Sequence, residues 1–533
     1  MGVARTNTIA LRSVAGDDGA VIRDRVLTGA AGSKRLSALL ADSFSNPPSV
    51  MNLGQTSLVY FLSRVAASAL GFVATVYFAR LLGADALGIY YQVVALVSWL
   101  AILGQVGLSG AVSKRISEGD DQRRYAAAAV TSIGGLFAFL AVTLAASRPY
   151  VDAYVGYPAT GYVVALLFAT LAWSTVASLL SGLHRVGTQG ALETVKTGGR
   201  SLLQVGTLFV GFELAGVFFG YVGGFLVATA VGAAVVAREL SGIALPRRRH
   251  FRSLLEYAKF AWLGRLQSRL FNYTDVLVLG LFVPSSLVGI YAAAWGIAQF
   301  LILFAGAISS TLFPEMSRLS ADGSPEEVQS LTEDALAYAG LLLIPGLVGG
   351  WVVGERLLAI YGEAFRQGGT VLAVLIVANL LMSYQNQLLN TLNAIDRPER
   401  SFRVNALFVV SNVSLNVVLI YLYGWLGAAV ATALSVSVSL VAAYRSLGAI
   451  VDFAIPYREI GRQWLAALAM GGVVLGGRRV ETTYRLLEHN LATVFVLVGL
   501  GAGVYFLALL AISPRFRETV DRNLPVALPF RSA

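Results

Sequence analysis

Long apolar stretches recur along nearly the whole chain and dominate its pattern of hydrophobic and polar positions. Each is long enough, as an α-helix, to cross the roughly 30 Å hydrocarbon core of a bilayer. One such stretch could be a buried core helix, but a dozen or more indicate a polytopic membrane protein. The stretches fall at 55–82, 86–110, 126–147, 161–183, 193–212, 215–237, 256–282, 286–313, 334–353, 369–391, 402–421, 424–446, 461–477 and 490–512. The pattern predicts an all-α fold of about fourteen transmembrane helices.

A stretch of some fifty residues in the first half aligns with the second half after a shift of 201 residues without gaps. This shift places Leu62-Ser63-Arg64 on Leu263-Gly264-Arg265, and Gly88-Ile89-Tyr90 on Gly289-Ile290-Tyr291. An even number of spans separates the two copies, so they share one orientation and are related by an axis along the membrane normal. The repeat predicts two parallel six-helix bundles that face each other across a central cavity, as in a transporter, followed by an extra C-terminal helix pair.

These patterns divide the chain into six expected parts. They are a disordered cytoplasmic tail at 1–51, a first bundle at 52–240, a basic cytoplasmic linker at 241–255, a second bundle at 256–447, a helix pair at 458–512 and a cytoplasmic tail at 513–533. The first part has no continuous apolar core after a basic start, so a cleaved signal peptide is not expected. A simpler alternative is that translation begins at Met51.

Composition and charge narrow the class of protein further. Only 13% of the residues are charged, against roughly 25% in soluble domains. The net charge of +10 comes largely from Lys and Arg in alternate loops, including the run Arg247-Arg248-Arg249. By the positive-inside rule these loops and both termini are cytoplasmic in a multi-pass protein of the cell membrane. The basic run is therefore interpreted as a topology determinant or a lipid-headgroup contact, and no nucleic-acid partner is expected.

Several kinds of chemistry are excluded by residues that the sequence lacks. The chain has no cysteine and only three histidines, which are far apart in the sequence, so neither a disulfide nor a metal site is expected. No phosphate-binding loop with Lys-Ser/Thr is present, which argues against a built-in ATPase. The short loops lack the clustered acids of a membrane glycosyltransferase. We therefore expect a protein that is not an enzyme and uses no cofactor.

Motifs in both halves point to a known family. They are Phe78-Ala79-Arg80-Leu81-Leu82-Gly83, Leu87-Gly88-Ile89-Tyr90, Val288-Gly289-Ile290-Tyr291, Leu312-Phe313-Pro314, Leu415-Asn416 and Tyr423-Gly424. Over 52–512 the chain resembles the polysaccharide-type flippases of the multidrug/oligosaccharidyl-lipid/polysaccharide exporter superfamily. The resemblance implies alternating-access translocation of a saccharide on an isoprenoid phosphate or pyrophosphate, for surface polysaccharide or protein glycosylation. Its expected partners are this lipid-linked saccharide, membrane lipids and glycan-assembly enzymes.

Two other functions remain open beside the flippase. One is a multidrug or metabolite antiporter of the same superfamily, which would favour an acidic, aromatic cavity for cationic drugs. The more distant one is a membrane glycan polymerase or transferase.

Arginines within the spans are the first candidates for binding the phosphate. Arg64 lies roughly 15 Å into the first span, Arg265 is its mate in the repeat, and Arg269 follows one turn later. A charge inside the bilayer costs about 2.5–3.5 kcal/mol on insertion scales, so it usually faces a cavity or a partner. A guanidinium can donate two hydrogen bonds to one phosphate and stays charged. The alternative is that these arginines snorkel to the interface or lock helices together.

Other polar residues in the spans leave two interpretations each. Asp275 either binds a coupling cation or proton, or is the structural partner of an arginine. Amides could contact sugar hydroxyls or pack between helices. The amides in question are Asn272, Asn386, Asn390 and Asn412.

One further group stands at the start of the fifth span. Glu193, Lys196 and Arg200 follow one another with i+3 and i+4 spacing there. They indicate either a solvated helix end or an inward-facing headgroup site.

Overall fold

The computed structural model describes the protein at 53–105, 107–242, 244–484 and 489–523. The side chains of 53–66, of 259–272, of several positions in 303–311 and of 522–523 lie outside this description. Contacts divide the chain into the units Met1–Leu58 and Val59–Ala533, and the account that follows concerns the second. The expected tail at 1–51 lies outside the described residues.

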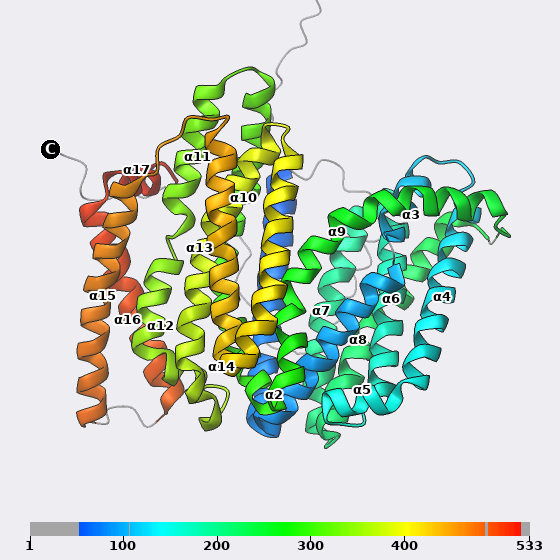
Figure 1. The fold of residues 1–533 in the computed structure, drawn as a ribbon, viewed down its shortest axis with the longest axis horizontal. Helices are drawn as coiled ribbons and strands as arrows, with labels where there is room; N and C mark the ends of the chain where they lie inside the picture. Colours follow the sequence, from blue (N-terminus) through cyan, green and yellow to red (C-terminus); the bar gives the residue numbers. More distant parts are fainter. Residues whose placement is uncertain (1–52, 106, 243, 485–488, 524–533) are drawn as a thin grey trace, which may run out of the picture. The chain divides into compact units, whose positions relative to one another are not determined.

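All regular elements in the described ranges are helices, which confirms the prediction of an all-α chain (Figure 1). They are α2 (Leu53–Gln105), α3 (Leu108–Ser117), α4 (Gln122–Ala146), α5 (Arg148–Val155), α6 (Thr160–Gly182), α7 (Val186–Phe209), α8 (Glu213–Leu240), α9 (Arg248–Phe282), α10 (Ser285–Ala321), α11 (Pro325–Ala339), α12 (Leu343–Leu358), the 3₁₀ helix η1 (Glu363–Gly368), α13 (Gly369–Ala394), α14 (Pro398–Gly448), α15 (Tyr457–Tyr484), α16 (Asn490–Ile512) and α17 (Pro514–Asn523).

Two of the long helices each contain two predicted spans. α2 is interrupted at Gly83, where φ is 85°, and α14 at Gly424, where φ is 58°. Glycine adopts this left-handed conformation without a steric penalty, so the chain can turn back at these points with very short connections. Among the described residues, nine helical stretches are long and apolar enough to cross a membrane. The multi-pass fold is thus confirmed, and the count of fourteen spans stays a prediction.

The helices of each half pack mainly within that half. α7 and α8 pair extensively, and α6 packs on α8, α4 and α3. In the second half α13 packs on α14, α10 and α12. α9 contacts both sets of helices, because it packs against α3 and α4 as well as against α14 and α10.

The two halves touch at residues that the repeat equates. A Cβ on Gly88 would lie 1.7 Å from the backbone oxygen of Ser285, and a Cβ on Gly289 would lie 2.1 Å from that of Ala84. Ser285 is the repeat mate of Ala84, as Gly289 is of Gly88. Such a reciprocal contact, in which each partner contacts the mate of the other, is what a two-fold axis produces. Only glycine at both positions allows the backbones to come this close.

The C-terminal helix pair covers a break in the ninth predicted span. α11 ends at Ala339 and α12 begins at Leu343, so carbonyls near the break lack partners within their own helix. Gln463 of α15 donates to the oxygen of Ala337 at 2.6 Å, and Tyr505 of α16 donates to that of Leu341 at 2.9 Å. Unpaired backbone groups are costly inside a bilayer. The extra pair therefore supplies hydrogen bonds that the second half needs.

The region expected to be a C-terminal tail begins with a helix that contacts α11. Arg515 of α17 forms an ion pair with Asp334 of α11. The hydroxyls of Tyr338 and Thr519 lie 2.6 Å apart. These contacts tie 514–523 to the second half of the protein.

Candidate functional site

A polar cavity of about 590 Å³ lies among the helices of the first half, and we call it the hydroxyl-rich cavity. Most of its lining residues carry a hydroxyl, amide or aromatic group. They are Ser98, Gln105, Ser109, Ser113, Thr170, Trp173, Ser174, Ala177, Ser178, Ser181, Gln189, Glu193, Lys196, Tyr221, Phe225 and Tyr273. They come from α2, α3, α6, α7, α8 and α9.

The cavity exists because α6 carries a polar stripe inside an otherwise apolar span. Thr170, Ser174, Ser178 and Ser181 recur at intervals of three or four residues, which places them on one face of the helix. The hydroxyl of Ser113 on α3 donates to that of Ser181 at 3.2 Å. A chain of hydroxyl groups therefore faces the cavity from two helices.

A linked set of charged and aromatic side chains closes one side of the cavity. Glu193 and Lys196 form an ion pair, and the indole of Trp173 donates to the Glu193 carboxylate at 3.0 Å. The Lys196 ammonium lies 4.8 Å from the ring centroid of Phe225 and 5.4 Å from that of Trp173. These cation–π contacts hold the ammonium between two rings. The Glu193–Lys196 ion pair leaves this part of the cavity wall close to neutral.

Arg200 lies one turn beyond Lys196 on α7 and differs from it in its partners. Its guanidinium lies 5.4 Å from the ring centroid of Tyr221, which also lines the cavity. The residue is half-buried, and its Nε is buried without a hydrogen-bond partner. No carboxylate pairs with it among the side chains that the structure describes. A half-buried cation with an unsatisfied donor is a site where an anion would be stabilised.

The arginines predicted to bind the phosphate lie on two helices of different halves. Arg64 belongs to α2, and Arg265 and Arg269 belong to α9, as does Asn272. Their side chains lie outside the described residues, so their predicted roles stay predictions. Arg200, in contrast, is described in full.

Asp275 is the centre of a buried polar cluster in the second half. Its carboxylate accepts hydrogen bonds from Tyr291 at 2.6 Å, Thr432 at 2.8 Å and Asn416 at 2.7 Å. Asn412, one turn before Asn416, donates to the Thr432 hydroxyl at 3.2 Å. The cluster therefore ties α9, α10 and α14 together. The side-chain oxygen of Asn416 remains buried without a partner.

Some amide side chains of α13 form hydrogen bonds to neighbouring helices, and others are exposed or half-buried. Gln385 accepts from Ser439 of α14 at 2.9 Å, and Gln387 accepts from Ser309 of α10 at 3.1 Å. These two amides hold helices together. Asn386 is exposed and Asn390 half-buried, and neither lines the hydroxyl-rich cavity.

Sequence reasoning missed most of the hydroxyl-rich cavity, including Trp173 and Tyr221. The regular spacing of the α6 hydroxyls was the signal that could have found it.

Taken together, a helical fold that spans the membrane, two related halves and a polar cavity within one of them define a transporter. The sequence pattern of the family described as polysaccharide biosynthesis protein matches residues 53–320, and that of the MatE family matches 263–422. The chain belongs to the polysaccharide biosynthesis protein family, among the polysaccharide-type flippases of the multidrug/oligosaccharidyl-lipid/polysaccharide exporter superfamily. This confirms the resemblance that the motifs carried.

Curated relatives and solved structures agree with this assignment. The probable flippase AglR of Haloferax volcanii is 32% identical over 481 residues, which are 89% of this chain and 99% of the relative. The probable low-salt glycan biosynthesis flippase Agl15 of the same organism is 28% identical over 90% of this chain and its own full length. The fold is similar to the lipid II flippase MurJ in an inward closed conformation, with a TM-score of 0.71 at 14% identity over 87% of this chain and all of that one.

Proposed function

We propose that this protein translocates a lipid-linked saccharide, carried on an isoprenoid phosphate or pyrophosphate, across the cell membrane by alternating access. The translocated saccharide would serve surface polysaccharide assembly or protein glycosylation, together with glycan-assembly enzymes. We also propose that both termini are cytoplasmic, since Lys and Arg concentrate in alternate loops and such loops face the cytoplasm by the positive-inside rule. Family membership supports the general activity.

The hydroxyl-rich cavity has the chemistry that a saccharide needs. The hydroxyls of Ser174 and Ser178 donate within α6, so towards a sugar they act as acceptors. The unpaired Gln105 amide nitrogen and Thr170 hydroxyl can donate to sugar oxygens. Trp173, Tyr221 and Phe225 add flat apolar faces beside these groups. The volume of about 590 Å³ lies within the range of ordinary small-molecule sites.

Arg200 is the single observation that carries the proposal for the headgroup. Its guanidinium lies against Tyr221, a lining residue of the hydroxyl-rich cavity, and has an unsatisfied donor and no carboxylate partner in the described part of the chain. A phosphate accepts two hydrogen bonds from one guanidinium, which suits a planar fork better than an ammonium. Arg64, Arg265 and Arg269 are proposed to contact the same phosphate or pyrophosphate from the facing helices.

The alternatives fit the cavity less well. A carrier of cationic drugs needs a free acid. Among the described side chains, the one carboxylate that lines the hydroxyl-rich cavity is Glu193, and it is bound by Lys196 and Trp173. A polymerase or transferase needs an acid or base positioned at the reacting bond. Glu193 is poorly suited to that role because Lys196 and Trp173 already bind its carboxylate. We therefore propose a transporter without catalytic activity.

Asp275 is proposed to couple transport to an ion gradient. Its cluster offers carboxylate, hydroxyl and amide oxygens. The unpaired side-chain oxygen of Asn416 could coordinate a cation without breaking a hydrogen bond. Hard cations prefer such all-oxygen sites, and an intramembrane acid is costly unless it has a function or a partner. A purely structural clamp of α9, α10 and α14 is the alternative.

The experiment is translocation of a fluorescent lipid-linked oligosaccharide in proteoliposomes. Arg200→Gln should lower the rate at least tenfold, since it removes the charge and keeps much of the bulk. The double variant Arg64→Ala, Arg265→Ala should abolish the activity. Arg238→Gln, an exposed cation at the end of α8, is the matched control and should leave the rate unchanged. Unchanged transport by both Arg200→Gln and the double variant would refute the basic headgroup site.

A further inference from the structure

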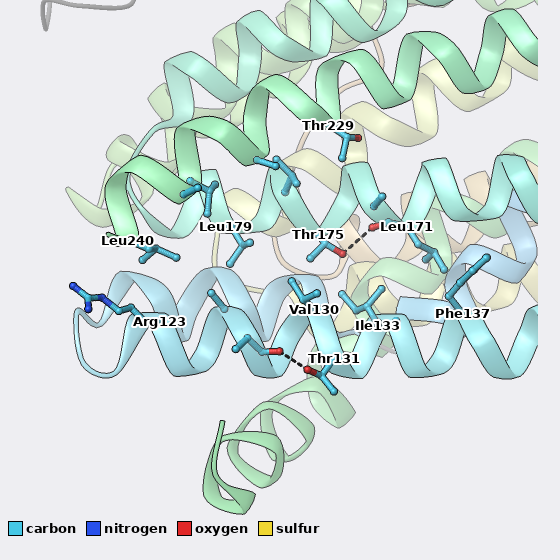
Figure 2. A pocket seen from close by; sticks show the side chains of 18 of the residues that line it. Arg123, Val130, Thr131, Ile133, Phe137, Leu171, Thr175, Leu179, Thr229 and Leu240 are labelled. Carbon is cyan, nitrogen blue, oxygen red and sulfur yellow. Dashed lines mark hydrogen bonds between the residues drawn. The ribbon is translucent and has the colours of Figure 1, made fainter. Parts of the chain in front are cut away.

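A second cavity, the α4–α8 groove, lies on the opposite face of α6 from the hydroxyl-rich cavity. Its volume is about 670 Å³. α4 and α8 both pack on α6 but barely touch each other, so a furrow is left between them. Leu171, Thr175 and Leu179 of α6 form its floor (Figure 2). Small residues such as Ala127 of α4 and Ala233 of α8 leave the space between the two helices unfilled.

The groove presents a mainly apolar surface, because the hydroxyls of its threonines are bound to backbone oxygens of their own helices. The hydroxyl of Thr175 donates to the oxygen of Leu171 at 2.8 Å, and that of Thr131 donates to the oxygen of Ala127 at 2.8 Å (Figure 2). Thr229 likewise donates within α8 to the oxygen of Phe225 at 2.7 Å. With these hydroxyls satisfied, the threonines offer no strong donor to a polar ligand. The groove therefore suits an alkyl chain and not a sugar.

One end of the groove is basic. Arg123, in the first turn of α4, lines both the groove and a shallow polar depression next to it. The basic side chains around it have acidic partners, since Arg124 and Arg249 share the Asp121 carboxylate and Arg185 pairs with Glu239. Arg123 is exposed and has no carboxylate partner among the side chains that the structure describes. Its charge is complementary to an anionic headgroup.

The groove is long enough to hold the hydrocarbon chain of a lipid in one leaflet. Arg123 and Phe137 line its two ends and are fourteen positions apart on α4, which is about 21 Å along the helix axis. Half of the hydrocarbon core is roughly 15 Å thick. A chain whose headgroup is held at Arg123 would thus lie along the groove over its full depth in that leaflet.

We propose that the α4–α8 groove binds a membrane lipid with an anionic headgroup, with the phosphate at Arg123 and a hydrocarbon chain between α4 and α8. This lipid is not the cargo. Thr170 and Ser174 of α6 face the hydroxyl-rich cavity, whereas Leu171 and Thr175 face the groove. The body of α6 therefore separates the groove from the cavity proposed for the saccharide. The site stands on its own contacts and does not depend on the proposed transport activity.

The test compares lipid retention by the purified full-length protein. Phosphatidylglycerol and phosphatidylcholine with the same chains are added to the protein in detergent, and bound lipid is measured by native mass spectrometry. Wild-type protein should retain phosphatidylglycerol several-fold better. Arg123→Gln should remove that preference, whereas Arg403→Gln, which changes an exposed cation of α14 that does not line the groove, should keep it.

A second pair of variants tests the chain site. Ala127→Phe fills the groove and should reduce retention of both lipids, whereas Val142→Phe, on an exposed position of α4 that does not line the groove, should not. Thermal melting of each variant separates lost binding from misfolding, and Arg123→Gln provides a test that does not alter packing. Equal retention of the two lipids by wild-type protein, or an unchanged preference in Arg123→Gln, would overturn the proposal. So would displacement of the bound lipid by an equimolar lipid-linked saccharide, which would identify the groove as part of the cargo site.

Discussion

The contact between Gly88 and Gly289 predicts a large effect from a single methyl group. In Gly88→Ala the new Cβ would lie 1.7 Å from the backbone oxygen of Ser285. The two helices would have to separate by at least about 1.3 Å to bring this distance to 3.0 Å, below which Cβ contacts are essentially never seen. Overpacking of this kind costs about 1–3 kcal/mol. Because the obstacle is backbone, no side-chain rotation can relieve it.

This cost applies only to conformations in which the two glycines touch. Alternating access, as proposed above, separates the halves on each side of the membrane in turn. A penalty of about 1.4 kcal/mol on one conformation changes the ratio of the two populations tenfold. Gly88→Ala should therefore open the contact in a larger fraction of molecules. Gly289→Ala should act similarly, and the double variant should be less than additive because both substitutions break the same contact.

Cysteine labelling can measure this opening, since the chain contains no cysteine. Ala292→Cys is a suitable reporter, because Ala292 lies nearly one turn after Gly289 and is only 3% exposed. Its reaction with a maleimide should be about tenfold faster in Gly88→Ala. Gly296→Ala, with no neighbour within 4 Å of its added Cβ, is the matched control and should label like wild type. Equal labelling and equal melting temperatures for Gly88→Ala and wild type would refute the argument.

Three other expectations follow from contacts described above. Asp275→Asn should remove the dependence of the translocation rate on an imposed ion gradient; a lower melting temperature with the gradient dependence retained would favour the structural alternative. Tyr505→Phe should lower the melting temperature, because it leaves the buried oxygen of Leu341 without its donor at a cost of about 1–3 kcal/mol. The hydrogen bond from His250 is the main cause that lowers the pKa of Asp121 from 3.8 to about 2. Stability from this carboxylate is therefore present above pH 4 and is lost as the pH falls towards 2, and Asp121→Asn should melt with less pH dependence in that window.

The helical, membrane-spanning fold could be predicted because its signal is local. Each apolar run specifies a span by its own length, and the repeat aligned Gly88 with Gly289. Their contact, however, is known only from the structure. The break between α11 and α12 could not be predicted in the same way. Pro345 in the run at 334–353 indicates an interruption, because it has no N–H for the oxygen of Leu341. The donors that make the interruption tolerable, Gln463 and Tyr505, lie far along the chain and are not indicated by the run itself.

The candidate site could be predicted only in part. A polar residue in a span indicates a cavity or a partner, but the sequence does not say which residues its side chain will contact. Arg200 and Lys196 are both basic and one turn apart, yet Lys196 pairs with Glu193 while Arg200 lies against Tyr221. That difference depends on which ring of α8 meets each side chain, and the spacing along α7 does not give this. The serines of α6 were likewise hidden within a long apolar run.

The hydrogen bonds across the α11–α12 break have a consequence for the synthesis of this protein. Tyr505 follows Leu341 by 164 residues. At about 5–20 residues per second, a ribosome needs roughly 8–33 s to make the intervening chain. Throughout that interval the carbonyls at the break must rely on water, lipid headgroups or an insertase for hydrogen bonds. A nascent chain that stalls after α14 would carry this defect permanently, and quality-control proteases could recognise it even though every span of the repeat had already been made.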